Sequence, residues 1–486
     1  MEKILSDAIT PDWVKDAIFY QIFPDRFAKS AQVEKPHNLE AWDAPPTNFG
    51  FKGGDLLGVV KHLDYLRDLG INAIYFNPIF QSASNHRYHT HDYFQVDPIL
   101  GGNSAFKTLL DAAHARGIRV ILDGVFNHAS RGFYQFSHAL ENGETSPYRD
   151  WFNLRDFPVR AYDDKPNYDA WWDLAALPKF NHKNPQVREF LFRVAEYWVR
   201  EGIDGWRLDV PGEIDDDEFW REFRRRVKSA NPDAYIVGEI WLRGDRWLRG
   251  DQFDAVMNYQ FTRACLSFFV DDLDRGLLQE QSYGAVRAMS GEEFARMLTD
   301  LLTWYPPAIV HAQLNLLDTH DTARFITIAR GDPTALQLAL LTMFCYVGAP
   351  TLYYGDEIAL EGRRDPDCRR AMIWEPSTRG REMIAYVKRM TALRQKYVAL
   401  RRGALTTLYA NNKEYAFARH QPNAPTVIVA LNAGREPVAL DLRVDRLLPD
   451  GTRLVEEWTR EEIVVQEGFT CGIQIAPREG TVWVAQ

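Results

Sequence analysis

The chain has 486 residues, of which 46% are hydrophobic, and its formal net charge is −10. This length predicts two or three domains with a large core. The acidic balance argues against nucleic acid and anionic membranes as partners, and it favours a neutral ligand.

The four cysteines are widely scattered and form no C-x-x-C pair, so we expect neither a disulfide framework nor a zinc site. Residues 1–16 lack the apolar core of a signal peptide, and no run reaches the roughly 18 apolar residues of a membrane helix. We therefore expect a cytoplasmic protein that contacts no membrane.

Eight short apolar runs recur up to residue 357, separated by helical patterns. They cover 17–23, 71–78, 117–128, 202–210, 234–241, 253–259, 314–320 and 349–357. Between the third and fourth runs, Val187, Leu191 and Trp198 recur at helical spacing behind a predicted N-cap, Asn184. Alternating strands and helices imply parallel strands, and eight units predict an α/β fold, a (β/α)₈ TIM barrel with its active site at the C-terminal strand ends.

Two segments depart from this alternation. Between the third and fourth runs lies far more chain than one helix needs, so we predict a small inserted domain over 127–182, after the third strand. After about residue 400, apolar residues alternate with period 2 and show no helix between runs, which predicts a C-terminal antiparallel β-sandwich over 400–486. The barrel then comprises 1–126 and 183–399.

Carboxylates, histidines and an arginine stand at the ends of these runs. They are Asp123, Asn127 and His128, then Arg207 and Asp209, Glu239, then Asp318, His320 and Asp321, and finally Asp356 and Glu357. A structural ion pair explains one or two such residues. A concentration at the ends of separate strands is typical of the catalytic face of a barrel.

Arg207 and Asp209 stand two residues apart in a strand, so they share one face. Glycoside hydrolysis needs one ionised carboxylate and one protonated carboxyl group on either side of the scissile bond. Arg207 is expected to keep Asp209 ionised, whereas Ile240 and Trp241 give Glu239 an apolar setting that favours its protonated form. A separation of about 5–5.5 Å between the two groups predicts a retaining mechanism through a covalent glycosyl-enzyme.

A metal hydrolase is the alternative reading of the segment HRYHTHDY (86–93). His86, His89, His91 and Asp92 are all potential ligands. The other strand ends offer no second His-x-His pair and no convincing bridging carboxylate. We therefore predict neither a metal nor a cofactor.

With these residues the chain resembles the α-amylase superfamily of glycoside hydrolases. Four segments resemble its main motifs in order, namely DGVFNH (123–128), GWRLDV (205–210), GEIW (238–241) and LLDTHDTAR (316–324). The resemblance implies that Asp209 is the nucleophile, Glu239 the general acid/base and Asp321 the carboxylate that stabilises the transition state. It also implies that four further residues line the glucose site at the scissile bond: Tyr88, His128, Arg207 and His320.

Further segments resemble the neopullulanase, cyclomaltodextrinase and maltogenic amylase group. LPKFN (177–181) is similar to its MPKLN motif, and NHRYHTHDY (85–93) is similar to its NHKYDTADY. DPDCRR (365–370) resembles the segment that holds the next sugar on the non-reducing side, which implies contacts from Asp365 and Arg369. The same likeness places Trp241 on the leaving-group side and Glu213 near the acceptor subsites.

Three departures from that group stand out. Its usual N-terminal β-domain builds a dimer, and here the barrel begins almost at once, so we expect a monomer or a dimer made without that domain. In the loop 25–35, Lys29 replaces a calcium-ligating oxygen, and an ammonium group cannot ligate a hard cation, so we predict no calcium there. Pro211 and Gly212 replace residues near the acceptor subsites.

The residues and the resemblance together lead us to expect a retaining α-glucan hydrolase. Its expected substrates are cyclic or short linear maltooligosaccharides and pullulan, joined by α-1,4 bonds, with α-1,6 cleavage left open. Three alternatives are a transglycosylase on the same substrates, a general starch-degrading α-amylase and a non-catalytic sugar-binding or transporter subunit. The last class typically loses catalytic carboxylates or carries a membrane segment, and this sequence shows neither change.

Overall fold

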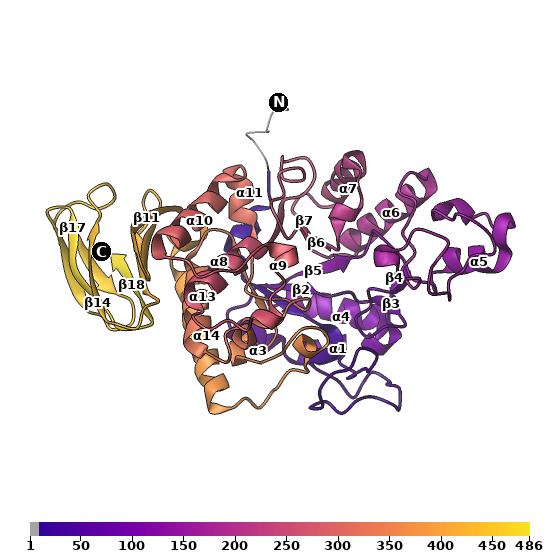
Figure 1. The fold of residues 1–486 in the computed structure, drawn as a ribbon, viewed down its shortest axis with the longest axis horizontal. Helices are drawn as coiled ribbons and strands as arrows, with labels where there is room; N and C mark the ends of the chain where they lie inside the picture. The colour runs from indigo at the N-terminus through magenta and orange to yellow at the C-terminus, as the bar shows by residue number, and fades with distance from the viewer. Residues whose placement is uncertain (1–8) are drawn as a thin grey trace.

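The computed structural model describes residues 9–486, and its centre is a closed barrel of eight parallel strands (Figure 1). Each apolar run predicted from the sequence supplies one strand, which confirms the predicted barrel. In barrel order the strands are β1 (Phe19–Ile22), β2 (Ala73–Phe76), β5 (Arg119–Gly124), β6 (Gly205–Leu208), β7 (Tyr235–Gly238), β8 (Ala255–Asn258), β9 (Leu314–Asn315) and β10 (Ala349–Tyr353). The strands are shorter than the runs, so several predicted site residues lie in the turns that follow them.

Helices lie in most connections between these strands. The longer ones are α2 (Leu56–Lys61), α3 (Leu63–Asp68), α4 (Gly102–His114), α6 (Pro185–Glu201), α7 (Asp217–Ala230), α8 (Tyr259–Phe269), α10 (Gly291–Thr303), α11 (Pro307–Ala312), α13 (Pro333–Cys345), α14 (Thr378–Lys396) and α15 (Val398–Arg402). Helix α6 begins as predicted, because the Asn184 side chain accepts a hydrogen bond from the Gln186 amide and Pro185 occupies the first turn.

Shorter elements fill the connections. They are the one-turn helices α1 (Pro24–Phe27), α9 (Glu280–Tyr283) and α12 (Phe325–Ile328), and 3-10 helices at Asp12–Asp16, Pro98–Leu100, Gly143–Thr145, Arg149–Trp151, Trp171–Asp173, Pro211–Glu213, Arg275–Leu277, Asp356–Ile358 and Asp367–Arg369. No helix within 9–486 is long and apolar enough to cross a membrane.

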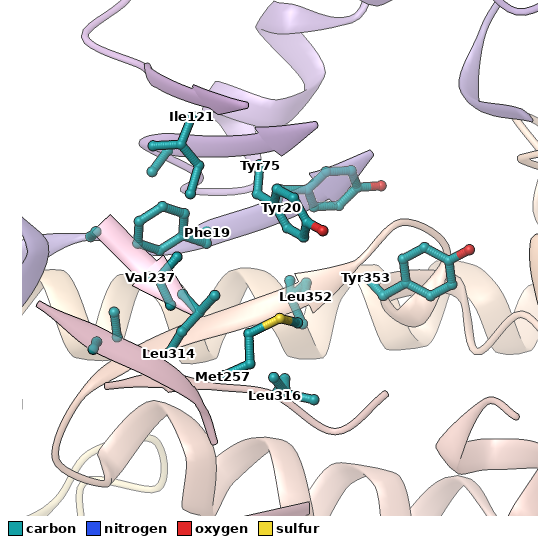
Figure 2. Packing of buried hydrophobic residues seen from close by; sticks show 14 of the residues in the cluster. Phe19, Tyr20, Tyr75, Ile121, Val237, Met257, Leu314, Leu316, Leu352 and Tyr353 are labelled. Carbon is teal, nitrogen blue, oxygen red and sulfur yellow. The ribbon is translucent and has the colours of Figure 1, made fainter. Parts of the chain in front are cut away.

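Side chains from different strands fill the middle of the barrel. Figure 2 shows Phe19, Val237 and Leu314, from β1, β7 and β9, pointing toward one another, and all three are fully buried. Strands β6 and β7 approach so closely that a Cβ atom at Gly205 would lie 2.2 Å from the Tyr235 carbonyl oxygen. Only glycine fits there. The strand ends that carry the site are therefore held by a close-packed frame.

The chain between β5 and α6 forms a loop-rich lobe at the end of the molecule opposite to the C-terminal strands (Figure 1). Its regular structure is α5 (Tyr134–Asn142), three of the short 3-10 helices and isolated bridges such as His128 with Lys179. Phe133 and Phe180 pack together in its core, which accounts for part of its aromatic content. It lies beside the hairpin of β3 (Phe80–Ser82) and β4 (Thr90–Val96), where the Ser130 amide donates to the Thr90 carbonyl.

The C-terminal part is an eight-stranded antiparallel sheet that folds over on itself around a second core. Leu440, Ile473 and Trp483 are buried in this core. The strands are β11 (Ala404–Asn411), β12 (Glu414–His420), β13 (Val427–Asn432), β14 (Val438–Arg443), β15 (Arg453–Glu456), β16 (Glu462–Gln466), β17 (Phe469–Ile475) and β18 (Glu479–Ala485). Strands β11 and β14, at the two edges of the sheet, contact each other, as the predicted β-sandwich requires.

Candidate active site

A cleft of about 500 Å³ is lined by residues from the C-terminal strand ends and from the lobe between β5 and α6. Eight of the predicted site residues line it: Tyr88, His128, Asp209, Glu239, Trp241, Asp321, Asp365 and Arg369. Arg207 and His320 are fully buried and contact these lining residues from behind. The structure thus brings together all but one of the eleven residues to which the sequence assigned catalytic or substrate-binding roles.

Arg207 is the centre of the charged cluster on the cleft floor. Its Nη1 atom donates to Asp123 Oδ1 at 2.8 Å and to Asp209 Oδ1 at 3.1 Å. Its Nη2 atom forms an ion pair with Glu239 Oε2 at 2.9 Å. The sequence predicted that Arg207 pairs with Asp209, and the structure shows one guanidinium shared by three carboxyl groups, one in β5 and the others directly after β6 and β7.

The setting of Glu239 differs from the apolar one that the sequence suggested. Glu239 Oε1 accepts a hydrogen bond from Trp241 Nε1 at 3.0 Å, and Oε2 accepts one from the Val210 amide at 3.0 Å. Val210 has φ of 35°, a left-handed conformation that is strained for a β-branched residue. This conformation of Val210 accompanies the contact of its N–H with Glu239.

Burial governs the titration of this cluster. It raises the pKa of Asp209 well above its ordinary range and raises the pKa of Glu239, while the Arg207 guanidinium opposes the shift at both. Burial also raises the pKa of Asp123 to about 6. Because the three carboxyl groups interact with one another and with one cation, they titrate as a unit, at a higher pH than ordinary carboxyl groups.

A hydrogen-bond chain links Tyr88 to the same floor. The Tyr88 hydroxyl donates to Asp123 Oδ2 at 2.8 Å and lies 2.6 Å from His320 Nε2. Gln21 Nε2 lies 2.9 Å from His320 Nδ1 and can only donate, so Nδ1 accepts and the ring proton sits on Nε2. Burial lowers the pKa of His320 well below 6.5, so this ring is neutral.

Asp321 is held between His320 and Arg369. Its Oδ2 atom lies 3.1 Å from His320 Nε2, and its Oδ1 atom accepts from Arg369 Nη2 at 3.2 Å. Arg369 also pairs with Asp365 at 3.0 Å and donates to the His320 carbonyl at 2.9 Å. The two residues predicted from DPDCRR therefore form one wall of the cleft and fix the third catalytic candidate.

Aromatic rings form other parts of the cleft lining. Trp241 stacks on Tyr259 with centroids 3.8 Å apart and planes within 5°, which leaves its indole N–H directed at Glu239. His128 stacks on Trp171 at 5.5 Å, and burial lowers the His128 pKa to about 3, so it too is neutral. Flat rings and neutral donors suit an uncharged sugar.

Glu213 is the predicted residue that neither lines this cleft nor supports it from behind. Its carboxylate pairs with Lys179 Nζ at 2.9 Å in a separate hollow of about 430 Å³ beside the lobe. The 3-10 helix Pro211–Glu213 carries the side chain toward that hollow. Its predicted place near the acceptor subsites remains a prediction.

Several cleft residues were missed in the sequence. Trp171, Trp172 and Gln279 line the cleft, and Gln279 Nε2 donates to the Asp321 carbonyl at 2.8 Å. The signal for the tryptophans was the aromatic-rich segment 127–182, but composition does not distinguish a cleft wall from a core. Gln279 lies in an irregular connection far from any motif, and nothing in its surroundings marks it.

The metal alternative rested on the histidines of 86–93. His86 and His89 contact each other edge to face at 4.9 Å, and burial lowers the pKa of His89 to about 4. No group of three or more His, Cys, Asp or Glu residues within 9–486 is arranged to hold a metal ion. In the loop 25–35, Lys29 Nζ lies over the Trp42 ring at 4.9 Å.

Comparisons with known proteins agree with this geometry. Residues 21–422 match the family model described as the alpha-amylase catalytic domain, and residues 405–484 match a neopullulanase-like C-terminal domain. A cyclomaltodextrinase from a Bacillus species is 47% identical over 426 residues, which cover 87% of this chain and 73% of that protein.

Two solved structures are also similar along nearly their whole lengths. The debranching enzyme of Nostoc punctiforme is 46% identical with a TM-score of 0.90, covering 98% of this chain and 99% of its own. The cyclic α-maltosyl-(1→6)-maltose hydrolase of Arthrobacter globiformis is 35% identical with a TM-score of 0.86, at 98% and 99% coverage. The chain belongs to the α-amylase family of glycoside hydrolases.

Proposed function

We propose that this enzyme hydrolyses α-1,4-glucosidic bonds in short linear and cyclic maltooligosaccharides through a covalent glycosyl-enzyme. The observation that carries the proposal is the meeting of Asp209 and Glu239 on the single guanidinium of Arg207, inside a cleft walled by aromatic rings. Carboxyl groups that share one guanidinium favour the short separation of a retaining pair over the longer separation of an inverting pair.

In the proposed reaction, a carboxylate oxygen of Asp209 attacks the anomeric carbon while Glu239 gives its proton to the leaving glycosidic oxygen. The bond from the anomeric carbon to that oxygen breaks, and an ester to Asp209 forms. Glu239, now ionised, takes a proton from water, which attacks the same carbon and releases Asp209. Asp321 faces the positive charge that develops on the sugar ring.

The remaining cleft residues are proposed to orient the sugar. They are Tyr88, His128, Arg207, Trp241, His320, Asp365 and Arg369, with Glu213 at a more distant acceptor position. Their mixture of rings and neutral or paired polar groups fits hydroxyl-bearing, uncharged substrates. We further propose that the segment 127–182 acts as the small inserted domain that forms one wall of the cleft.

The size of the cleft supports oligosaccharides. Its volume of about 500 Å³ falls in the range typical of small-ligand sites, ~300–1,000 Å³. The names of the similar proteins, cyclomaltodextrinase and cyclic α-maltosyl-(1→6)-maltose hydrolase, indicate activity on cyclic glucans in those proteins. Opening of cyclic rings, including mixed-linkage ones, and cleavage of pullulan are therefore part of the proposal, as is a cytoplasmic location.

The test is a product time course with β-cyclodextrin, pullulan, soluble starch and cyclic maltosyl-maltose at matched glucose content. We expect ring opening to be faster than starch cleavage, and NMR of early products to show retained α configuration. Preference for starch would refute the oligosaccharide assignment, and β products would refute the covalent mechanism. Asp209→Asn should abolish turnover and still bind maltoheptaose in calorimetry, and an active variant would overturn the choice of nucleophile.

A further inference from the structure

Three stacked rings run from the cleft floor to the solvent. Trp172 stacks on Trp171 with centroids 4.6 Å apart and planes within 11°, and Trp171 stacks on His128 at 5.5 Å and 22°. All three side chains line the active-site cleft. We call His128, Trp171 and Trp172 the aromatic ladder. Its lower end lies in the catalytic pocket and its upper end at the mouth of the cleft.

Trp172, the outermost ring of the aromatic ladder, is unusually exposed. All fourteen tryptophans lie within the described residues, and Trp172, at 77% exposure, is the only exposed one. One face of its ring is covered by Trp171, so the other face and the edges are open to solvent. A flat apolar ring that is held in place at a cleft mouth is a ready surface for the C–H face of a sugar.

The backbone that holds this ring is strained. Trp172 has φ of 51° and ψ of 32°, and Asp173 follows with φ of 57°. Left-handed conformations are unfavourable for residues with side chains, and two in succession outside glycine are rare. Strain of this kind persists where it serves a function, and here it accompanies the stacking of the Trp172 ring on Trp171.

The two inner rings of the aromatic ladder, those of His128 and Trp171, carry polar atoms without hydrogen-bond partners among residues 9–486. Trp171 Nε1 and His128 Nε2 are buried, and neither has a hydrogen-bond partner among residues 9–486. Buried polar atoms in native proteins normally have partners, so groups left without one at a cleft are candidates for ligand contacts. The ladder therefore offers both stacking faces and hydrogen-bonding groups.

We propose that the aromatic ladder forms a glucan subsite in which a glucosyl unit outside the scissile pair stacks on the open face of Trp172. This inference rests on the proposed function, since it assigns part of the same substrate to a further position. Trp172 then selects substrates by length, because only chains that extend beyond the catalytic carboxyl groups reach it. The contribution is to binding, and Trp172 takes no part in the bond exchange.

The experiment compares Trp172→Gly, Trp172→Phe and Asp173→Gly in the full chain. Glycine adopts the left-handed conformation without steric cost, so Trp172→Gly removes the ring and keeps the path of the loop. Phenylalanine restores a flat ring. Asp173→Gly is the matched control, because it relieves strain at the neighbouring residue and leaves both tryptophans in place. Each variant is assayed on maltoheptaose and on p-nitrophenyl α-glucoside.

We expect Trp172→Gly to lower kcat/KM for maltoheptaose by about threefold to tenfold, through KM, and to change the aryl glucoside by less than about twofold. Trp172→Phe should recover most of the loss, and Asp173→Gly should behave as the unaltered enzyme. Equal losses on both substrates, no loss at all, or the same loss in Asp173→Gly would overturn the inference. A changed molecular mass in Trp172→Gly by light scattering would also overturn it, since the ring would then serve a contact between copies.

A binding measurement separates this inference from the proposed function. The Kd of maltoheptaose is measured by calorimetry in Asp209→Asn and in Asp209→Asn combined with Trp172→Gly. A weaker Kd in the double variant supports the subsite even if the unaltered enzyme proves to act on another glycosidic bond. Equal affinity refutes the subsite even if the enzyme hydrolyses maltoheptaose as proposed.

Discussion

Replacement of Arg207 is the most direct test of the charged cluster. Its guanidinium is fully buried and contacts Asp123, Asp209 and Glu239. Arg207→Met removes the charge and all three contacts, whereas Arg207→Lys keeps the charge but lacks the planar fork of donors with which the guanidinium reaches three carboxyl groups. The two variants together separate the effect of charge from the effect of geometry.

The expected magnitude follows from the contact with Asp209. A charge-assisted hydrogen bond is worth about 1.5–3 kcal/mol, so its loss should lower kcat/KM by roughly 10- to 150-fold. The same free energy favours protonation of Asp209, and one pKa unit corresponds to about 1.4 kcal/mol. The acid limb of the pH profile should therefore move upward by about 1–2 units in Arg207→Met and by less in Arg207→Lys.

The assay is kcat/KM for maltotriose against pH, with thermal unfolding followed in parallel. Stability of Arg207→Met should fall as pH rises, because the folded state holds protons on carboxyl groups that ionise freely in the unfolded chain. If kcat/KM of Arg207→Met falls while the acid limb of its pH profile stays in place, Arg207 positions Asp209 without controlling its ionisation. A change of less than about threefold would refute the role of the guanidinium altogether.

Three further predictions concern other parts of the molecule. Trp241→Phe removes the hydrogen bond to Glu239 Oε1, which stabilises the ionised form, so the Glu239 pKa and the alkaline limb of kcat/KM should rise, by under about one unit; an unshifted limb would contradict this. The hydrogen bond with Asp204 raises the pKa of His114, so His114→Gln should lower the free energy of unfolding below pH 6.5 and change it much less above the raised pKa. The loss at low pH should be under about 1 kcal/mol, because solvent screens this partly exposed pair. Equal losses in chemical unfolding at pH 5.5 and 8.5 would refute this prediction. Because the loop 25–35 presents an ammonium group, dialysis against EDTA should leave the melting temperature unchanged, and restoration of a lowered value by calcium would refute this.

The barrel was predictable because its strands are buried on both sides. Such strands appear in the sequence as continuous apolar runs, and each of the eight runs became a strand. The residues that directly follow the strands formed by these runs, Asp209 after β6 and Glu239 after β7, then had to meet at one end of the barrel. The positions of these residues at the strand ends were therefore sufficient to predict that they form a cluster.

Contacts between elements were not predictable in the same way. That Tyr88 donates to Asp123 depends on how the connection after β2 folds over the barrel, which no local pattern encodes. The polar setting of Glu239 depends on the left-handed backbone of Val210, a conformation that its own side chain disfavours. Trp172 belongs to an aromatic-rich segment in which some rings, such as Phe180, are buried in the core, and composition does not tell these rings from the exposed ones.

The arrangement around Arg207 has a consequence for where the catalytic proton resides. Glu239 accepts two neutral hydrogen bonds in addition to its ion pair, whereas the Asp209 side chain is paired, among residues 9–486, with Arg207 alone. These donors favour an ionised Glu239, which is the opposite of what leaving-group protonation needs. In the proposed reaction, positive charge that develops on the sugar ring favours an ionised Asp209, and the glycosidic oxygen beside Glu239 gives that residue a group to which it can donate. Under the proposed roles, the protonation of Glu239 therefore depends on groups that the substrate brings, since the donors of the protein itself favour the ionised form.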